Sequence, residues 1–299
     1  MPHDGSIQHR LDDSTRRIEL MATLVSTLTP TMADASGTGA TVDLRYITAD
    51  EAKLGLFLAT TADVALIANR SAGANIPGYT GAATDQINSL GRDVFTAGST
   101  TATATDSAIA RDYFQHDGAV TSALECGDLD FAETNGDVTW AIVIDPQTSA
   151  TNEFIMGCLT DDSGQRAVIY KDTSNRIRFN NKQSDSPSGT QDELRSSAGT
   201  ALATNTKQIV WVSYRDSDRS AAIGIGSSGT ADVTATWTND LMRGSTGLQI
   251  GASDSNTSFV FSGAFYAAYR FPKFYSEIVD AAGSAVFATE LALIDDIYL

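Results

Sequence analysis

The feature that most constrains the fold is a series of short apolar segments, each bounded by turn residues, that begins near residue 85 of the 299-residue chain. Runs with alternating apolar and polar positions are typical of β-strands, and their connections carry Asp, Ser, Asn and Gly, which favour tight turns. Strands at this spacing build antiparallel sandwiches. We predict strands at residues 138–144, 154–159, 166–170, 176–179, 208–214, 221–225, 248–251 and 259–271.

The residue pattern also predicts where two segments lie in the fold. Residues 208–214 are apolar at both odd and even positions, which predicts a strand at the centre of its sheet, buried on both faces. Residues 290–299 carry apolar side chains at helical spacing and predict a short helix that caps the sandwich. The sequence shows no repeat with a period of about 20–50 residues, which disfavours a solenoid or a propeller.

An amphipathic helix is predicted at residues 6–29, before Pro30. Three heptads are marginal for an isolated coiled coil, and Leu20 and Leu24 widen the apolar stripe. We therefore interpret residues 1–40 as an arm that docks on a partner protein or forms the stalk of a homo-oligomer. A helix packed inside its own chain is the third alternative. The residues predicted to mediate anchoring or oligomerisation have the a and d spacing of a heptad: Leu11, Ile18, Met21, Val25 and Leu28.

Residues 41–84 give a mixed signal, with a helix or a strand indicated at residues 50–67 and a Gly/Pro break at residues 75–78. We interpret them as a linker or a small connecting region between the arm and the strand-rich part. The predicted domain organisation is thus an arm at residues 1–40, a connection at residues 41–84 and a β-sandwich at residues 85–299.

Charge and composition exclude several classes of partner. The formal net charge is −17, and no segment gathers Lys and Arg into a stripe that could neutralise a phosphate backbone, so we expect no nucleic acid. The first residues lack the apolar core of a signal peptide and no run reaches the length of a membrane span, which predicts synthesis in a cytoplasm without membrane contact. Cys126 and Cys158 lack the spacing of a zinc site and are predicted to be buried free thiols.

Four stretches, in order, carry a resemblance to a known superfamily. They read YFQHDG, LECGDLDF and GDVTW from residue 113 to 140; the hairpin at residues 209–226; LQIG with FSG at residues 248–263; and YRF at residues 269–271 before the last helix. This order resembles the concanavalin A-like, laminin G-like superfamily. Residues 86–91 and the Thr-rich residues 99–105 are similar to the opening of versions found in phage tail-fibre and virion-surface proteins. The resemblance implies a mainly β fold, an antiparallel jelly-roll β-sandwich, with an N-terminal helical or extended arm.

The resemblance also implies loop sites for calcium or glycans. The oxygen-rich candidates are Asp161 and Asp162 as metal ligands and Asp254 and Asn256 as ligand-binding residues, because hard cations prefer carboxylate and carbonyl oxygens. Ordinary hairpin turns use the same residues, so we expect no cofactor and keep Ca²⁺ as the alternative. Trp237, flanked by polar residues, is the tryptophan that would stack on a sugar ring, with packing in the core as its other interpretation.

An enzymatic alternative rests on Asp128, Asp130 and Glu133, which resemble the Glu-x-Asp-x-x-Glu strand of some glycoside hydrolases. Retaining hydrolysis needs two carboxyl groups about 5 Å apart across a cleft. Asp128 replaces the longer Glu, and the Thr-Asn-Gly turn directly after Glu133 ends the strand. We therefore predict no catalytic residues and no enzyme.

These observations together predict a non-enzymatic structural protein of a bacteriophage virion. The arm would attach to other virion proteins, homo-oligomerisation is expected, and the sandwich would decorate the particle or belong to a fibre or tail attachment that contacts host-surface glycans. The alternative is a cell-surface or secreted polysaccharide-binding or glycoside hydrolase-type protein, which the lack of a signal peptide disfavours.

Overall fold

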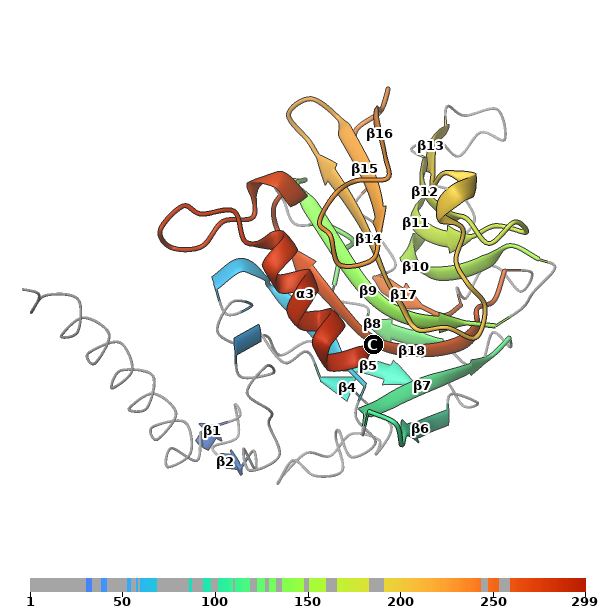
Figure 1. The fold of residues 1–299 in the computed structure, drawn as a ribbon, viewed down its shortest axis with the longest axis vertical. Helices are drawn as coiled ribbons and strands as arrows, with labels where there is room; N and C mark the ends of the chain where they lie inside the picture. The colour runs from blue at the N-terminus through green and yellow to red at the C-terminus, as the bar shows by residue number, and fades with distance from the viewer. Residues whose placement is uncertain are drawn as a thin grey trace, which may run out of the picture.

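The computed structural model describes residues 31–33, 39–41, 53–54, 58, 60–68, 86–87, 94–97, 102–109, 111–118, 123–126, 129–132, 136–147, 151–159, 166–182, 191–242, 247–252 and 259–299. Most of these residues belong to two large antiparallel sheets that pack face to face, with helix α3 (Phe287–Tyr298) on the outside of one of them (Figure 1). The predicted antiparallel β-sandwich is confirmed.

The first sheet has the strand order β13-β12-β11-β10-β17-β8-β5-β4. The strands β10 to β13 follow one another along the chain and pair as successive hairpins. The bounds are β4 (Gln86–Ile87), β5 (Val94–Ala97), β8 (Leu124–Cys126), β10 (Glu153–Leu159), β11 (Arg166–Lys171), β12 (Ile177–Lys182), β13 (Gln191–Arg195) and β17 (Leu248–Ile250).

The second sheet has the strand order β16-β15-β14-β9-β18-β7-β6, and β3 pairs with β18 beside β7. Strand β14 lies between β9 and β15, which confirms its predicted central place. The bounds are β3 (Val64–Ile67), β6 (Ala102–Asp106), β7 (Arg111–Asp117), β9 (Val138–Pro146), β14 (Gln208–Arg215), β15 (Ser220–Ile225), β16 (Val233–Thr236) and β18 (Ser262–Phe271). Two 3₁₀ helices, η3 (Ala198–Thr200) and η4 (Tyr275–Glu277), complete the body.

Strand alternation divides the apolar side chains between two cores. On β9, Trp140 and Ile142 point between the sheets, whereas Ala141 and Val143 point to the outer face of the second sheet. Successive side chains of a strand point to opposite faces, so a strand that is apolar throughout needs cover on both. The first sheet covers one face of β9. Cys158, also predicted as a buried free thiol, lies in the core between the sheets.

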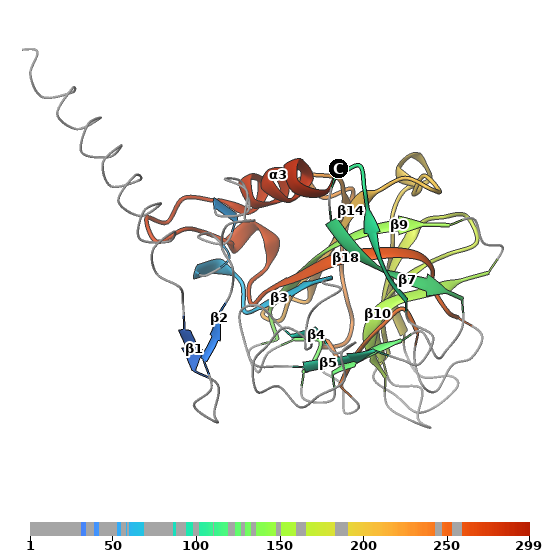
Figure 2. The same cartoon turned by 90° about the horizontal axis from the view of Figure 1, so that it is seen from below.

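Helix α3 supplies the cover on the other face. Figure 2 shows it lying across the outside of the second sheet, above β14 and β18. Phe287 packs edge-on against Trp211 of β14, with ring centroids 5.3 Å apart, and the hydroxyl groups of Tyr298 and Tyr269 are 3.2 Å apart. The predicted capping helix therefore exists, and it turns part of an outer sheet face into a second core.

Part of the region predicted as a linker belongs to the sandwich. The sequence indicates a connection at residues 41–84, whereas residues 64–67 form β3 and pair with residues 267–270 of β18. Both carboxylate oxygens of Asp63 accept hydrogen bonds from the buried Arg270 guanidinium, at 2.9 and 2.8 Å. This strand lies within the segment where the sequence indicates a helix or a strand, and four residues are too few for periodicity to decide between them.

The predicted arm falls largely outside the described residues. Within it the structure describes β1 (Thr31–Ala33), which pairs with β2 (Gly39–Thr41) as an antiparallel hairpin. The helix expected at residues 6–29, with the five heptad residues from Leu11 to Leu28, lies outside that part of the chain. Among the described helices, none is long and apolar enough to span a membrane.

Candidate functional site

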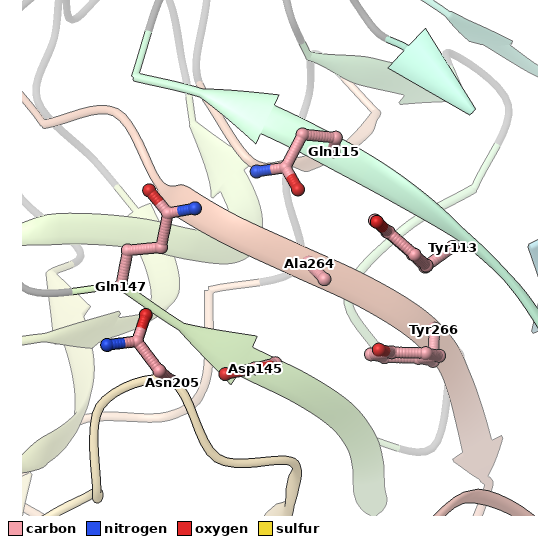
Figure 3. A pocket seen from close by; sticks show the side chains of 7 residues that line it. All are labelled: Tyr113, Gln115, Asp145, Gln147, Asn205, Ala264 and Tyr266. Atoms are coloured by element: carbon pink, nitrogen blue, oxygen red, sulfur yellow. The ribbon is translucent and has the colours of Figure 1, made fainter. Parts of the chain in front are cut away.

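A polar pocket opens on the outer face of the second sheet, beyond the end of α3 (Figure 3). Its walls come from β7, β9, β18 and the segment before β14. The hollow measures about 100 Å³, well below the ~300–1,000 Å³ usual for small-molecule sites, and it is open to solvent. The lining residues are Tyr113, Gln115, Asp145, Gln147, Asn205, Ala264 and Tyr266.

The pocket exists because outward positions that α3 leaves uncovered carry polar or small residues. On β7, Tyr113 and Gln115 point outward while Phe114 is buried in the core between the sheets. On β18, Ala264 leaves space where a larger side chain would fill the hollow. A β-bulge follows, where the register against β9 shifts between Phe265 and Ala267, and bulges commonly redirect side chains next to sites.

Two tyrosines form one side of the pocket. The rings of Tyr113 and Tyr266 lie 5.3 Å apart at 41°, and Tyr298 of α3 supports Tyr266 from behind at 6.2 Å. Tyr266 is held further by Asp106, whose Oδ2 accepts hydrogen bonds from the Tyr266 hydroxyl (3.1 Å) and from Lys207 Nζ (3.0 Å). Tyr266 is buried and Tyr113 is half-buried, so Tyr113 is the ring that offers surface to a ligand.

Asp145 lies at the end of β9, where the backbone N–H of Thr206 and the charge of Lys207 stabilise its carboxylate. Its Oδ1 is buried and has no hydrogen-bond partner among the described residues. Burial raises the pKa of this carboxyl above its ordinary value; the nearby Asp106 adds to the shift, and Lys207 and a backbone hydrogen bond from Thr206 oppose it. A buried acceptor without a donor costs about 1–3 kcal/mol, and a ligand that supplies the donor recovers that free energy.

Amide groups form the opposite side. Gln147 Oε1 accepts a hydrogen bond from Ser262 Oγ at 3.1 Å, and Gln115 Nε2 donates to the carbonyl oxygens of His116 and Gly263. Asn205 sits at a turn in the left-handed region, with φ of 53°, and its backbone N–H bonds to the Pro146 carbonyl oxygen. These bonds fix the side chains and leave further amide groups facing the hollow (Figure 3).

The combination can hold a small ligand that is rich in hydroxyl groups. One half-buried aromatic ring offers an apolar surface, Asp145 accepts hydrogen bonds, and the amides both donate and accept. All three kinds of group stand on paired strands or on a hydrogen-bonded turn, so the ligand would meet a site that is already formed.

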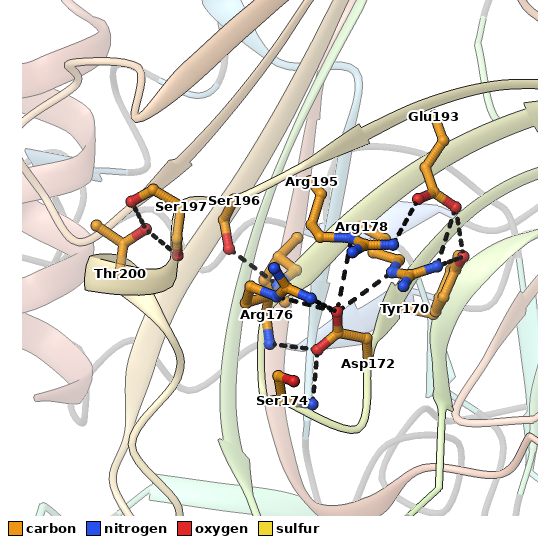
Figure 4. Close-up of polar contacts among 11 residues, drawn as sticks. Tyr170, Asp172, Ser174, Arg176, Arg178, Glu193, Arg195, Ser196, Ser197 and Thr200 are labelled. Atoms are coloured by element: carbon orange, nitrogen blue, oxygen red, sulfur yellow. Dashed lines mark hydrogen bonds and ion pairs between the residues drawn. The ribbon is translucent and has the colours of Figure 1, made fainter.

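A second polar cluster, which we call the arginine cluster, lies on the outer face of the first sheet (Figure 4). Asp172 is its centre: Oδ1 accepts from the backbone N–H groups of Ser174 and Arg176, and Oδ2 from the side chains of Arg176 and Arg178. Glu193 accepts from Arg178, Tyr170 and Arg195. The hydrogen bonds to the Asp172 carboxylate outweigh its burial and hold its pKa below the ordinary value.

Among the ligand and metal candidates singled out from the sequence, the structure describes Trp237. Trp237 lies in the core between the sheets, 4% exposed, with its ring 4.7 Å from that of Phe179 and 5.3 Å from that of Tyr214. A buried indole offers no face to a sugar, so we do not assign Trp237 to the pocket. The loop candidates Asp161, Asp162, Asp254 and Asn256 lie outside the described residues.

The described part of the chain does not show the pair of carboxyl groups that the enzymatic alternative requires. Asp128 and Glu133 lie outside the described ranges, and Asp130 is exposed, with its carbonyl oxygen bonded to Arg270. In the described part of the chain, no three His, Cys, Asp or Glu side chains gather as they would around a metal ion.

The pocket itself escaped the sequence analysis, since its residues come from four separate segments. One signal was present: Tyr113 and Gln115 alternate with buried residues on a strand next to β18, so both had to face outward.

Comparisons with known proteins identify the fold. No protein-family model matches the chain, and no curated protein matches it either. Solved structures do match. The binding domain of botulinum neurotoxin serotype G has a TM-score of 0.53 at 13% identity, covering 78% of this chain and 51% of that one. The binding domain of Paraclostridial Mosquitocidal Protein 1 has a TM-score of 0.53 at 8% identity, covering 72% and 49%.

A third match is the botulinum neurotoxin serotype D ligand binding domain in complex with N-acetylneuraminic acid, with a TM-score of 0.53 at 10% identity, covering 81% of this chain and 52% of that one. This chain thus spans about half the length of each of these structures. They are described as binding domains rather than catalytic ones. At such low identity the likeness shows the fold alone: the chain has a β-sandwich fold similar to that of these binding domains.

Proposed function

We propose that this protein is a non-enzymatic binding module that holds a glycan in the pocket on the outer face of its second sheet. The observation that carries the proposal is Asp145, a half-buried carboxylate with one buried, unpartnered oxygen, placed across from the Tyr113 ring in an open, preformed hollow. A sugar offers both what the carboxylate lacks, a hydroxyl donor, and an apolar face for the ring.

The fold supports this assignment. One of the matched structures is described as a ligand binding domain in complex with N-acetylneuraminic acid, a sugar, and the others as binding domains. A lectin-type sandwich is therefore a reasonable carrier for a sugar site, although fold alone does not define function. In this chain the argument rests on the pocket and its side chains.

The attachment of this module to a virus particle is a separate part of the proposal. We propose, from the sequence, that residues 1–40 attach the module to a phage virion and that the chain forms homo-oligomers. The matched structures named above are not virion proteins, and the anchoring residues lie outside the described part of the chain. The molar mass of the whole protein and of a form lacking residues 1–40 tests self-association: if both are monomers, the arm does not oligomerise the chain.

A glycan array probed with the whole protein tests the sugar-binding proposal. Ala264→Leu fills the hollow from its floor and should weaken any array hit by about tenfold or more, equivalent to ~1.4 kcal/mol. Ala292→Leu makes the same change at an exposed position of α3 and serves as the matched control, with binding unchanged. A protein that binds no glycan, or an Ala264→Leu variant that binds as well as the control, contradicts the proposal.

A further inference from the structure

In the described part of the chain, the lining of the pocket holds an acidic side chain and no basic one, and this restricts the class of ligand that the pocket can bind. Of the seven described residues that line it, Asp145 alone is charged. The nearest cation is Lys207, which already donates to Asp106 at 3.0 Å and lies over the Tyr266 ring at 5.8 Å. Arg111 stands on the same face of β7, two residues before Tyr113, but it is not part of the lining.

Lys207 therefore belongs to the wall of the pocket, where it contacts Asp106 and Tyr266, and does not bind the ligand. Its partner Asp106 is itself fixed by three donors: Lys207, the Tyr266 hydroxyl and the backbone N–H of Ala108. Together they hold the pKa of Asp106 below its ordinary value despite burial, so Asp106 is ionised at neutral pH. The wall thus contributes one cation and one anion that cancel, and the lining adds the carboxyl group of Asp145.

An acidic ligand would meet this arrangement unfavourably. A ligand carboxylate in the pocket would approach Asp145 without a lining cation between them, and like charges repel more strongly where water is partly excluded. A hydroxyl or ammonium group, by contrast, supplies the donor that Asp145 Oδ1 lacks. Sites built to pair one buried polar group strongly reject ligands that leave it unpaired.

We infer that the pocket selects neutral or amino sugars, which donate a hydrogen bond to Asp145, and excludes acidic sugars. This inference rests on the proposed function, since it names the class of sugar for the same pocket. It also sets this chain apart from the matched domain that is described in complex with N-acetylneuraminic acid, an acidic sugar. Shared fold does not carry shared ligand chemistry, because the side chains of the pocket decide it.

Matched sugars test the inference with the whole protein. The probes are glucose, glucosamine and glucuronate, and galactose, galactosamine and galacturonate, each used to compete against an array glycan that binds. Within each set the ring is constant and the charge changes. We expect each uronate to compete at least about tenfold more weakly than its neutral parent, and the amino sugar at least as well as that parent.

Asp145→Asn keeps the shape of the side chain and removes its charge. In this variant the neutral-to-uronate ratio should fall toward one, whereas Asp296→Asn, an equal change of charge at an exposed position of α3, should keep the wild-type ratio. A uronate that competes as well as its neutral parent overturns the charge selection while leaving sugar binding intact. If no array glycan binds at all, the proposed function fails, and the inference fails with it.

Discussion

The two outer faces of the sandwich each carry a polar cluster, and the two clusters differ in how completely their carboxylates are paired. In the arginine cluster, Asp172 receives hydrogen bonds from two backbone N–H groups and two guanidinium groups, and Arg195 adds an ion pair at 3.6 Å. In the pocket, Asp145 has one buried oxygen without a partner among the described residues. Four hydrogen bonds therefore hold the Asp172 carboxylate, whereas the Asp145 carboxylate keeps one oxygen unpaired.

The number of donors decides the direction of each pKa shift. Burial disfavours the charged form of every carboxyl, and hydrogen bonds to that form oppose it. Asp172 is 1% exposed and yet its pKa is lowered, because its donors outweigh burial. The pKa of Asp145 is raised, and Glu290 of α3, with a hydrogen bond from Thr61, follows the same rule: burial raises its pKa to about 7. The balance between donors and burial thus sets the direction of the pKa shift of each of these carboxyl groups.

The largest effect is expected at the complete cluster. Asp172→Ala removes the shared partner of the arginines and of two backbone N–H groups, and should lower the free energy of unfolding by about 3–5 kcal/mol, measured by urea denaturation. Glycan binding by the folded variant should be unchanged, since Asp172 is not part of the pocket.

The matched variant Asp172→Asn retains an oxygen for the backbone bonds and should lose less stability than Asp172→Ala. Because the pKa of Asp172 is lowered in the folded protein, its contribution is present above the unfolded value of about 3.8 and is lost as the pH falls through the folded pKa. The difference in the free energy of unfolding between wild type and Asp172→Asn should therefore become smaller at acidic pH. A difference that is constant with pH would mean that the ionised cluster is not what stabilises this end of the sheet.

An intermediate effect is expected at Glu290, and it has the opposite pH dependence. A pKa raised from 4.5 to about 7 means that the neutral acid suits the fold: stability is complete below about pH 4.5 and falls as the pH rises through 7. Glu290→Gln should raise the free energy of unfolding by about 2–3 kcal/mol at pH 8 and leave it almost unchanged at pH 4. Urea denaturation at both pH values measures this, and an equal pH slope in variant and wild type would contradict it.

The smallest effect on stability is expected in the pocket. Asp145→Asn removes a charge that the fold leaves poorly paired, so the free energy of unfolding should stay the same or rise by up to about 0.5 kcal/mol, measured by urea denaturation. Asp296→Asn again provides the control. A loss of more than about 1 kcal/mol would place Asp145 among the structural carboxylates and remove the contrast between the two clusters.

The sequence predicted the strands where the signal was local. The expected strands at residues 138–144 and 208–214 correspond to Val138–Pro146 and Gln208–Arg215, and the expected helix at residues 290–299 to Phe287–Tyr298. Strand β13, QDELR, escaped because it is a polar edge strand whose alternation is weak.

The pocket could not be predicted for a different reason. Tyr113, Asp145 and Ala264 become neighbours only through the order β9-β18-β7, and this order depends on long-range pairing that no local pattern reports. The unpaired oxygen of Asp145 is likewise a property of its surroundings rather than of its own segment. Trp237, by contrast, stood out by residue type, and the structure buries it.

The pairing of β3 with β18 also determines where this protein can be shortened. A fragment that starts at residue 85 would lack β3 and leave the backbone groups of residues 267–270 without their strand partner. An open, apolar sheet edge invites neighbouring molecules to pair with it, so such a fragment should aggregate. Arg270 would also lose both bonds to Asp63 while remaining enclosed beside Trp140. Fragments intended for crystallisation or display should therefore begin before residue 53, where the described residues ahead of β3 start.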